Sequence, residues 1–314
     1  MQKRTTDEPD QSLHARIFGN AYLLLTLTML FWAGNTIAGR AIAGTVPPLT
    51  LAWLRWTLAA AIILPIAWPH LKRDWPVIRR NWPILSLLGT LGCGIFISLY
   101  YTGLTMTTAL NGLIINSAVP ILIPLAVFVL YRETLNRWQT LGILLSLIGV
   151  IAVITKGDLA ILVRLDLNRG DLFVLAAMSV FAIYTALLRK QPKMHWISFG
   201  ACCFIVAAIV TFPLFLSEAL MGETIKPTFG AFFAVLYVGT LPSVMAQIMY
   251  IRGVELIGGN RAGAFLNLIP LFGALLAMII LGERLYAFHL VGFGLIICGV
   301  WLAQRQKRTV SAVQ

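Results

Sequence analysis

The chain has 314 residues, of which 59% are hydrophobic and 11% are charged, and its formal net charge is +12. Soluble domains carry about 25% charged residues, so this composition excludes an ordinary soluble fold and indicates membrane-spanning helices of roughly 20 residues each. The net charge suggests a nucleic-acid partner, but most Lys and Arg residues fall on one predicted side of the membrane. Such a bias is a topology signal, so we expect no nucleic-acid partner.

Ten apolar stretches predict ten transmembrane helices, at about 19–39, 50–68, 82–104, 109–130, 138–155, 170–188, 196–217, 229–251, 262–281 and 287–304. They are too long and too uniformly apolar for barrel strands. Residues 1–18 predict a disordered cytoplasmic tail, and residues 305–314 predict a basic cytoplasmic tail. The basic bias places both termini in the cytoplasm, and we expect a plasma membrane, such as a bacterial inner membrane.

An internal repeat organises the chain. Four residues return at the same spacing in the second half, with Pro120, Glu133, Gly142 and Gly149 matched by Pro270, Glu283, Gly292 and Gly299. Glu is scarce in this chain, so the match indicates two copies of one structural unit. Each copy holds five predicted helices, an odd number, so the second must start on the opposite side of the membrane. We predict a first repeat at 19–155, an external linker at 156–169 and an inverted second repeat at 170–304.

Pro120 and Pro270 are expected in the middle of the fourth and ninth helices, where they would act as hinges. Proline has no N–H, so the carbonyl four residues earlier loses its partner, at a cost of several kcal/mol in lipid unless another donor replaces it. Weakened helices at matched positions in two halves point to a central site. The alternative is a local kink that a neighbouring hydroxyl or amide repairs.

Two pairs of glycines lie seven residues apart and share a helix face, Gly142 with Gly149 and Gly292 with Gly299. They predict close packing between the fifth and tenth helices. The two repeated acids close the fourth and ninth helices, and we expect each to pair with adjacent arginines, Glu133 with Arg132 or Arg137 and Glu283 with Arg284.

The candidate substrate-binding residues are polar or amphipathic aromatic side chains at mid-depth, which need partners in lipid and should face inward. They are Trp32, Asn35, Tyr100, Tyr101, Asn116, Ser117, Tyr184, Ser243, Gln247, Tyr250 and Asn267. A pocket of this kind suits a small neutral or zwitterionic solute. The competing interpretation for the tyrosines is an interfacial aromatic belt. We assign Trp53, Trp56, Trp68, Trp75, Trp82 and Trp138 to that belt or to packing.

All acids and histidines fall in predicted tails, loops or helix ends, so we expect no proton carrier at mid-depth. Arg55 is the one charged residue at depth. It either attracts a substrate carboxylate or, more commonly for such an arginine, snorkels to the surface or pairs with a backbone carbonyl.

Enzymatic motifs are absent from the sequence, which has no phosphate-binding glycine loop, no metal-binding helix motif and no Ser/His/Asp set. We therefore expect no catalytic residues, no cofactor and no metal. An intramembrane lipid-modifying enzyme, an alternative of another class, would need ionisable residues that converge at depth. The four cysteines lie in apolar stretches and predict free packing residues.

Two inverted sets of five helices with the doubled motif from Pro120 and Pro270 resemble the EamA-type carriers of the drug/metabolite transporter superfamily. The segment from Pro48 to Arg55 is similar to the start of that family's second helix. The resemblance covers about residues 20–304 and implies a ten-helix bundle with a central cavity, alternating access, and export of amino acids or other metabolites. The aromatic interior, with Tyr100 and Tyr101, is similar to that of YddG-like exporters of aromatic amino acids.

Three further expectations concern the substrate, the partners and the oligomeric state. A carrier of phosphorylated sugars or nucleotide sugars is the runner-up, and it would require two or more inward basic residues. The expected partners are a small-molecule substrate and the lipid bilayer. A monomer is plausible because the repeat supplies both halves of the carrier.

Overall fold

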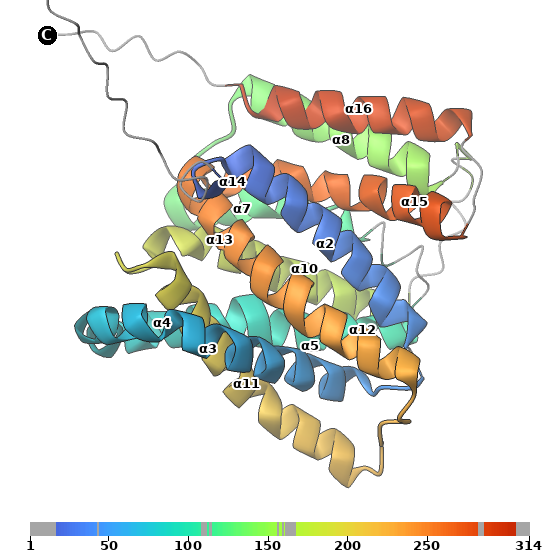
Figure 1. The fold of residues 1–314 in the computed structure, drawn as a ribbon. Helices are drawn as coiled ribbons and strands as arrows, with labels where there is room; N and C mark the ends of the chain where they lie inside the picture. The colour runs from blue at the N-terminus through green and yellow to red at the C-terminus, as the bar shows by residue number, and fades with distance from the viewer. Residues whose placement is uncertain are drawn as a thin grey trace, which may run out of the picture.

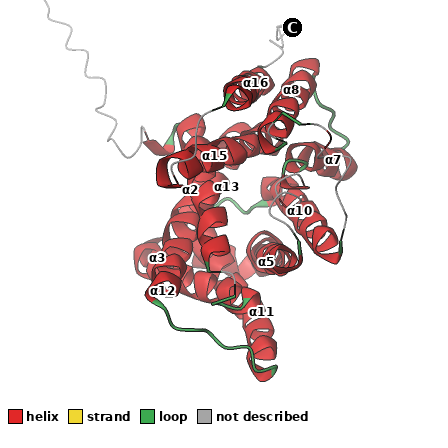
Figure 2. Cartoon of the chain, turned by 90° about the vertical axis from the view of Figure 1, so that its right-hand side faces the viewer, coloured by secondary structure: helices red, strands yellow, loops and turns green. Residues whose placement is uncertain are grey.

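The described part of the chain is all helical. The computed structural model describes residues 17–42, 44–107, 112, 115–155, 157–158, 160, 168–281 and 286–305, and within them it contains helices and loops but no strand (Figures 1 and 2). Seven of the described helical segments are long and apolar enough to cross a membrane, and two shorter apolar helices accompany them. The chain is therefore an integral membrane protein built from helices.

The first half contains α2 (Ala21–Ala41), α3 (Pro48–Arg80), α4 (Trp82–Gly89), η1 (Thr90–Ile95), α5 (Phe96–Met106), α7 (Val119–Tyr131) and α8 (Arg137–Ile154). The second half contains α10 (Arg169–Leu187), η2 (Leu188–Lys190), α11 (Trp196–Leu220), α12 (Phe229–Thr240), η3 (Leu241–Met245), α13 (Ala246–Ile257), α14 (Gly259–Ala264), η4 (Phe265–Asn267), α15 (Leu268–Leu281) and α16 (Ala287–Ala303). Helix lies in each of the ten predicted ranges, and the number of membrane crossings stays a prediction.

Helix α3 is much longer than predicted. The expected range ended at 68, but the helix continues to Arg80 through Pro69 and Pro76. Its last turns carry Arg79 and Arg80, which favour a helix C-terminus. The apolar signal stops where the helix leaves the apolar layer, whereas the hydrogen-bonded backbone continues into the polar region. Asp74, predicted in a loop, therefore lies on α3.

Two short π-helical segments occur at equivalent positions of the two repeats, one between α4 and α5 and the other between α12 and α13. They are η1 and η3, and residues 91–95 of the first correspond to residues 241–245 of the second in the repeat. Pro242 explains η3, because it has no N–H to offer the carbonyl of Val238. The hydroxyl of Ser243 donates to that carbonyl instead, at 2.6 Å. π-Helical turns of this kind are frequent at functional sites.

The helix breaks expected at the two repeated prolines are present, but each break precedes its proline. Residues 117–118 form a turn before α7, and Pro120 is one of the first residues of that helix. The 3₁₀ turn η4 precedes α15, in which Pro270 is the third residue. The placement of both prolines in mid-helix is therefore wrong. At the start of a helix the missing N–H of proline costs little, because that donor would lack a helical partner anyway.

The predicted packing between the fifth and tenth helices is confirmed, because α8 and α16 lie side by side (Figure 1). A Cβ added at Gly142 would stand 2.5 Å from the carbonyl oxygen of Gly299, and one added at Gly149 would stand 2.7 Å from the carbonyl oxygen of Gly292. The four repeated glycines thus bring two backbones into direct contact.

The remaining helices pack crosswise between the halves. Helix α2 contacts α13 and α15 of the second half, and α10 contacts the corresponding α5 and α7 of the first. Gly253 on α13 meets Leu25 on α2, and its repeat partner Gly103 on α5 meets Val174 on α10. Helices α3 and α11, themselves repeat partners, contact each other. These contacts therefore occur in matched pairs when the halves are exchanged.

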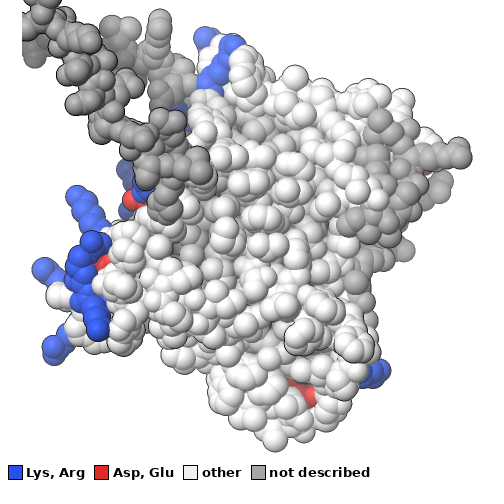
Figure 3. Space-filling model, viewed as in Figure 1, with Lys and Arg blue, Asp and Glu red and all other residues white. Residues whose placement is uncertain are grey.

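Basic side chains gather mainly on the left of the view in Figure 3, few charged side chains lie on the opposite side, and the face between them carries almost none. Two of the described acids, Glu218 and Asp171, cap helices. Glu218 accepts hydrogen bonds from the backbone N–H groups of Leu49 and Thr50 at the start of α3, and Asp171 lies in the capping box of α10. Glu133 pairs with Arg189, not with Arg132 or Arg137 as predicted. Glu283 and Arg284 lie outside the described residues.

Candidate functional site

A small cavity lies where the two halves meet. Its volume is about 60 Å³. The first half contributes α2, α3, η1, α5 and the segment before α7, and the second contributes α10, α13, η4 and α15. The lining residues are Trp32, Asn35, Thr36, Arg55, Trp56, Gly92, Phe96, Ile97, Tyr100, Asn116, Val119, Met178, Phe181, Gln247, Leu266 and Ile269. Sequence segments from both ends of the chain thus form one site.

Five of the predicted binding residues line this cavity directly, namely Trp32, Asn35, Tyr100, Asn116 and Gln247. Four others, Tyr101, Tyr184, Ser243 and Tyr250, lie in contact with lining residues. The four tyrosines of this group are buried, with at most 7% of each exposed, so the aromatic-belt interpretation is wrong for them. Trp68, Trp75 and Trp82 are each more than half exposed, and their place in an interfacial belt stays a prediction.

One chain of hydrogen bonds connects α2, α3 and α5 of the first half with η3 of the second half. The Nε of Arg55 donates to Ser243 Oγ at 2.8 Å, and its Nη1 donates to the Tyr101 hydroxyl at 2.8 Å. Tyr101 in turn donates to Oδ1 of Asn35 at 3.1 Å. Arg55 is only 3% exposed, so the prediction that it snorkels to the surface is wrong.

A second set of polar contacts connects α10 with α13. The amide Nε2 of Gln247 donates to the Tyr184 hydroxyl at 3.1 Å, and the hydroxyls of Thr185 and Tyr250 lie 3.0 Å apart. Tyr184 is fully buried and its ring touches the backbone of Gly92, where a Cβ would overlap it. Glycine is therefore required at this point of η1 for the close approach of α10.

Aromatic rings form the apolar wall of the site. Phe181 on α10 stands at its centre, with its ring 4.9 Å from Phe96, 5.7 Å from Trp32 and 5.4 Å from Tyr250. Ring pairs at these distances and tilted angles are favourable in themselves. The indole N–H of Trp32 donates to the carbonyl of Pro242 at 3.2 Å, which fixes the ring against η3.

The other predicted residues take different places. Asn267 is 1% exposed, and its Nδ2 donates to Ser146 Oγ on α8 at 2.6 Å, so it joins α8 to the segment before α15 instead of lining the cavity. Ser117 is buried in the turn before α7. Pro120 and Pro270 are buried just after the two breaks, beside the lining residues Val119 and Ile269.

Sequence reasoning missed Trp56, Phe96 and Phe181 as cavity residues. A signal was present for α3, because the buried positions Ala52, Arg55, Trp56, Ala59 and Ile63 recur with helical spacing and mark one inward face. Trp56 packs on Phe204 as well, with ring centroids 5.4 Å apart. No comparable signal distinguishes Phe96 or Phe181 from other phenylalanines.

The charge of the site is positive. Arg55 is the one charged residue among the lining side chains of the described part, and no acid lines the cavity there. In the same part of the chain no group of three His, Cys, Asp or Glu side chains forms a metal site.

A separate open groove of about 470 Å³ lies between α2, η4 and α16, lined by Tyr22, Phe265, Trp301 and others, and it includes none of the predicted site residues.

The sequence profile of the EamA-like transporter family matches residues 19–155 and again residues 168–304. The chain belongs to the EamA-like transporter family. The doubled match covers nearly all of the described helices. Membership supports a transporter function for this protein.

Relatives of this EamA-like transporter carry transporter names without a stated substrate. The uncharacterized transporter YyaM of Bacillus subtilis is 27% identical over 90% of this chain and 93% of its own length. An uncharacterized transporter of Archaeoglobus fulgidus is 28% identical over 91% of this chain and 98% of its own. A solved crystal structure, 21% identical, covers 90% of this chain and 96% of that chain with a TM-score of 0.72, and so shares the fold.

Proposed function

We propose that this EamA-like transporter is a secondary carrier that exports or equilibrates small zwitterionic or neutral metabolites, most simply amino acids including aromatic ones, by alternating access. The observation that carries the proposal is the cavity between the halves, which combines stacked aromatic rings with hydrogen-bonding side chains. Sites with apolar walls and a few placed polar groups are typical of small-molecule binding.

The arrangement of the halves supports alternating access. The crosswise contacts of α2 and α10 are what an inverted repeat of five helices in each half produces, and ten membrane spans complete that scheme. Helix breaks before Pro120 and Pro270 and π-helical turns at η1 and η3 lie at matched positions beside the cavity. These are the points at which the helices bend at least cost, so we propose them as the hinges.

The volume of the cavity supports a change of shape during the cycle. About 60 Å³ accommodates roughly two water molecules, whereas drug-sized ligands occupy about 300 Å³ or more. An amino acid therefore enters only when the halves move apart on one side of the membrane. We propose that rocking of the halves opens the site alternately to the two sides of the membrane.

The charges near the cavity favour transport without proton coupling. Proton-coupled carriers usually keep an ionisable residue at depth, and no Asp, Glu or His among the described residues lines the cavity. Facilitated diffusion or exchange needs no such group. We place the carrier in the plasma membrane with both termini in the cytoplasm, on the side of the basic cluster at the end of α3.

Counterflow tests the transport proposal. Purified protein is reconstituted in liposomes loaded with an unlabelled amino acid, and uptake of the labelled one is followed with the pH gradient and membrane potential collapsed. Protein-dependent uptake of at least one amino acid is expected. Absence of flux for every amino acid would remove the substrate proposal, and accumulation driven by a proton gradient alone would refute the uncoupled mechanism.

A further inference from the structure

Arg55 is a buried cation that the protein does not neutralise. It is the eighth residue of α3, about 10 Å along the helix from its start, and 3% exposed. Its hydrogen-bond partners are two hydroxyls, and no carboxylate in the described part of the chain lies within ion-pair distance. Burying an unpaired charge is costly, so such a group is usually retained for a ligand or a functional step.

The cavity beside Arg55 holds more donors than the protein uses. A guanidinium has five N–H groups, and Ser243 and Tyr101 each take one of them. Trp56 lines the same cavity, and its buried indole Nε1 has no partner among the described residues. The guanidinium carbon lies 4.8 Å from the centre of the Trp56 ring, so the two donors are neighbours.

We propose that Arg55 and Trp56 form a carboxylate-binding end of the cavity, so that the cargo carries one carboxylate on a small apolar body. This inference rests on the proposed transport function and names the chemistry of its substrate. A carboxylate matches the forked guanidinium and brings the missing negative charge. The aromatic wall around Phe181 then receives the apolar body. A phosphate dianion would leave one negative charge unmatched, because Arg55 is the one cation among the described lining residues.

The cavity offers the ammonium group of an amino acid weaker partners than it offers the carboxylate. No acid in the described lining is available to an ammonium group, whereas the side-chain oxygen of Gln247 has no hydrogen-bond partner among the described residues, its Nε2 being the atom that donates to Tyr184. Neutral carbonyl oxygens and ring faces bind a cation more weakly than a carboxylate does. The carboxylate is therefore required for binding, and the amine adds little.

Three probes that share one ring separate these contributions. L-phenylalanine has both groups, 3-phenylpropanoate has only the carboxylate, and 2-phenylethylamine has only the amine. Binding to the purified full-length protein in lipid nanodiscs is measured by titration calorimetry. The first two probes are expected to bind with dissociation constants within about fivefold of each other, and the amine at least tenfold more weakly. Equal or tighter binding of the amine, or no binding of either carboxylate, overturns the proposal.

Variants assign the effect to the two donors. Arg55→Gln is expected to weaken both carboxylates at least tenfold, while Arg55→Lys keeps part of the affinity because it keeps the charge. Trp56→Phe keeps an aromatic ring and the charge of the site but removes the free N–H together with the five-membered ring of the indole, so a loss of about threefold is expected even where the arginine variant fails to fold. Unchanged affinity in folded Arg55→Gln, or in Trp56→Phe when the former is unfolded, overturns the assignment.

Binding and transport measurements distinguish failure of the carboxylate site from failure of the proposed carrier function. Carboxylate binding without counterflow would retain the site and remove the carrier function proposed above. Counterflow that does not depend on Arg55 would retain the carrier and remove the site. Inorganic phosphate that displaces 3-phenylpropanoate at equal concentration would replace the carboxylate with a phosphorylated cargo and overturn the inference.

Discussion

At the scale of single residues, buried polar groups in this transporter hold the halves together. Arg55 of the first half donates to Ser243 of the second, while Tyr101 connects the same guanidinium to Asn35. Water is scarce at this depth, so a group that loses its partner has no substitute. Single hydroxyls in this chain therefore affect stability more than their size suggests.

Tyr101→Phe is expected to lower the free energy of unfolding by about 1–3 kcal/mol, because it leaves both Arg55 Nη1 and Asn35 Oδ1 without their partner. Thermal unfolding of the purified protein in one detergent measures the change. Tyr22→Phe is the matched control, since Tyr22 is 49% exposed. Equal melting temperatures for the two variants would show that the hydroxyl of Tyr101 is not needed for stability.

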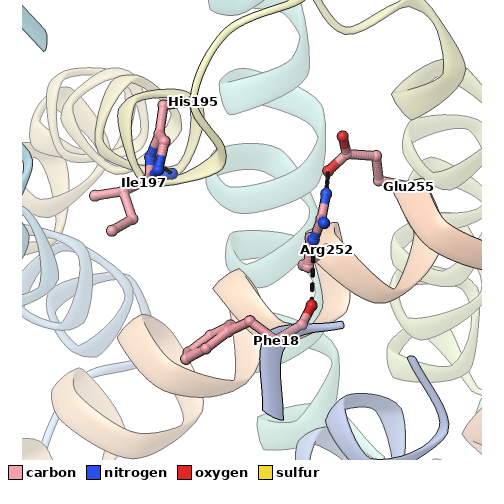
Figure 4. A network of polar contacts seen from close by, with 5 residues as sticks. All are labelled: Phe18, His195, Ile197, Arg252 and Glu255. Carbon is pink, nitrogen blue, oxygen red and sulfur yellow. Dashed lines mark hydrogen bonds and ion pairs between the residues drawn. The ribbon is translucent and has the colours of Figure 1, made fainter. Parts of the chain in front are cut away.

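His195, which precedes α11, is a residue whose protonation is expected to affect stability. His195 caps α11, where its Nδ1 accepts from the backbone N–H of Ile197 at 3.3 Å (Figure 4). Burial, with stacked His70 and nearby Arg73, lowers the pKa of His195 below its usual value of about 6.5. Asp74 opposes the shift, and Arg252, which also bonds the Phe18 carbonyl, adds to it.

This lowered pKa sets the direction of a pH effect. The unfolded chain binds more protons than the folded one between the lowered pKa and about 6.5, so the contribution to stability is complete above 6.5 and is lost as the pH falls through that window. His195→Asn keeps a capping acceptor but does not titrate. The melting temperature of the native protein is expected to fall further than that of the variant from pH 7.5 to 5.5. Parallel curves would contradict this.

At the scale of elements, glycine positions decide which helices touch. The backbones of α8 and α16 meet through Gly142, Gly149, Gly292 and Gly299, and no larger residue fits between them. Helix α16 also contains Gly294, and a Cβ added there would have no atom within 4 Å in the described structure. Helix α16 therefore contains a tightly packed glycine, Gly299, and a glycine with open space around it, Gly294.

Gly299→Ala is expected to destabilise the protein by about 1–3 kcal/mol, because its Cβ would lie 2.5 Å from the backbone nitrogen of Ser146 and would force α8 away from α16. Gly294→Ala on the same helix is expected to be neutral or slightly stabilising, since alanine favours helix more than glycine does. Unfolding temperatures of the two variants test the pair. The idea fails if both variants behave alike.

At the scale of the whole molecule, the question is whether the halves are inverted. Arg73 near the end of α3 and Glu223 just after the end of α11 lie at corresponding ends of these repeat-partner helices, and both side chains are exposed. An inverted repeat places them on opposite sides of the membrane. A parallel repeat would place both on the same side.

Single cysteines at these two positions test the topology, in a variant in which the exposed Cys298 is serine. A membrane-impermeant maleimide added to intact cells is expected to label Glu223→Cys at once and Arg73→Cys only after permeabilisation. Labelling of both from the same side would exclude the inverted arrangement. The two variants control for each other, because each carries one exposed thiol.

The features that could be predicted from the sequence are those that depend on neighbouring residues in the chain. Apolar stretches predict helices, because lipid leaves backbone groups no partner outside their own segment. Sequence patterns predicted the α8–α16 contact and the presence of the two helix breaks, although each break precedes its proline. The end of α3 was missed because a helix continues beyond the apolar layer, and η1 was missed because nothing in Gly92 and its neighbours signals a π-helical turn.

The sequence by itself determined the class of the protein, its duplication and most of the polar residues near the cavity, because scarce polar groups in an apolar chain have few places to lie. Only the tertiary structure decided that Arg55 is buried instead of snorkelling, that Trp56 and Phe181 complete the site, and that Asn267 turns toward Ser146. The reason is physical. Which side of a helix faces a cavity depends on neighbours that are distant in sequence, and these neighbours come from the other half of the chain.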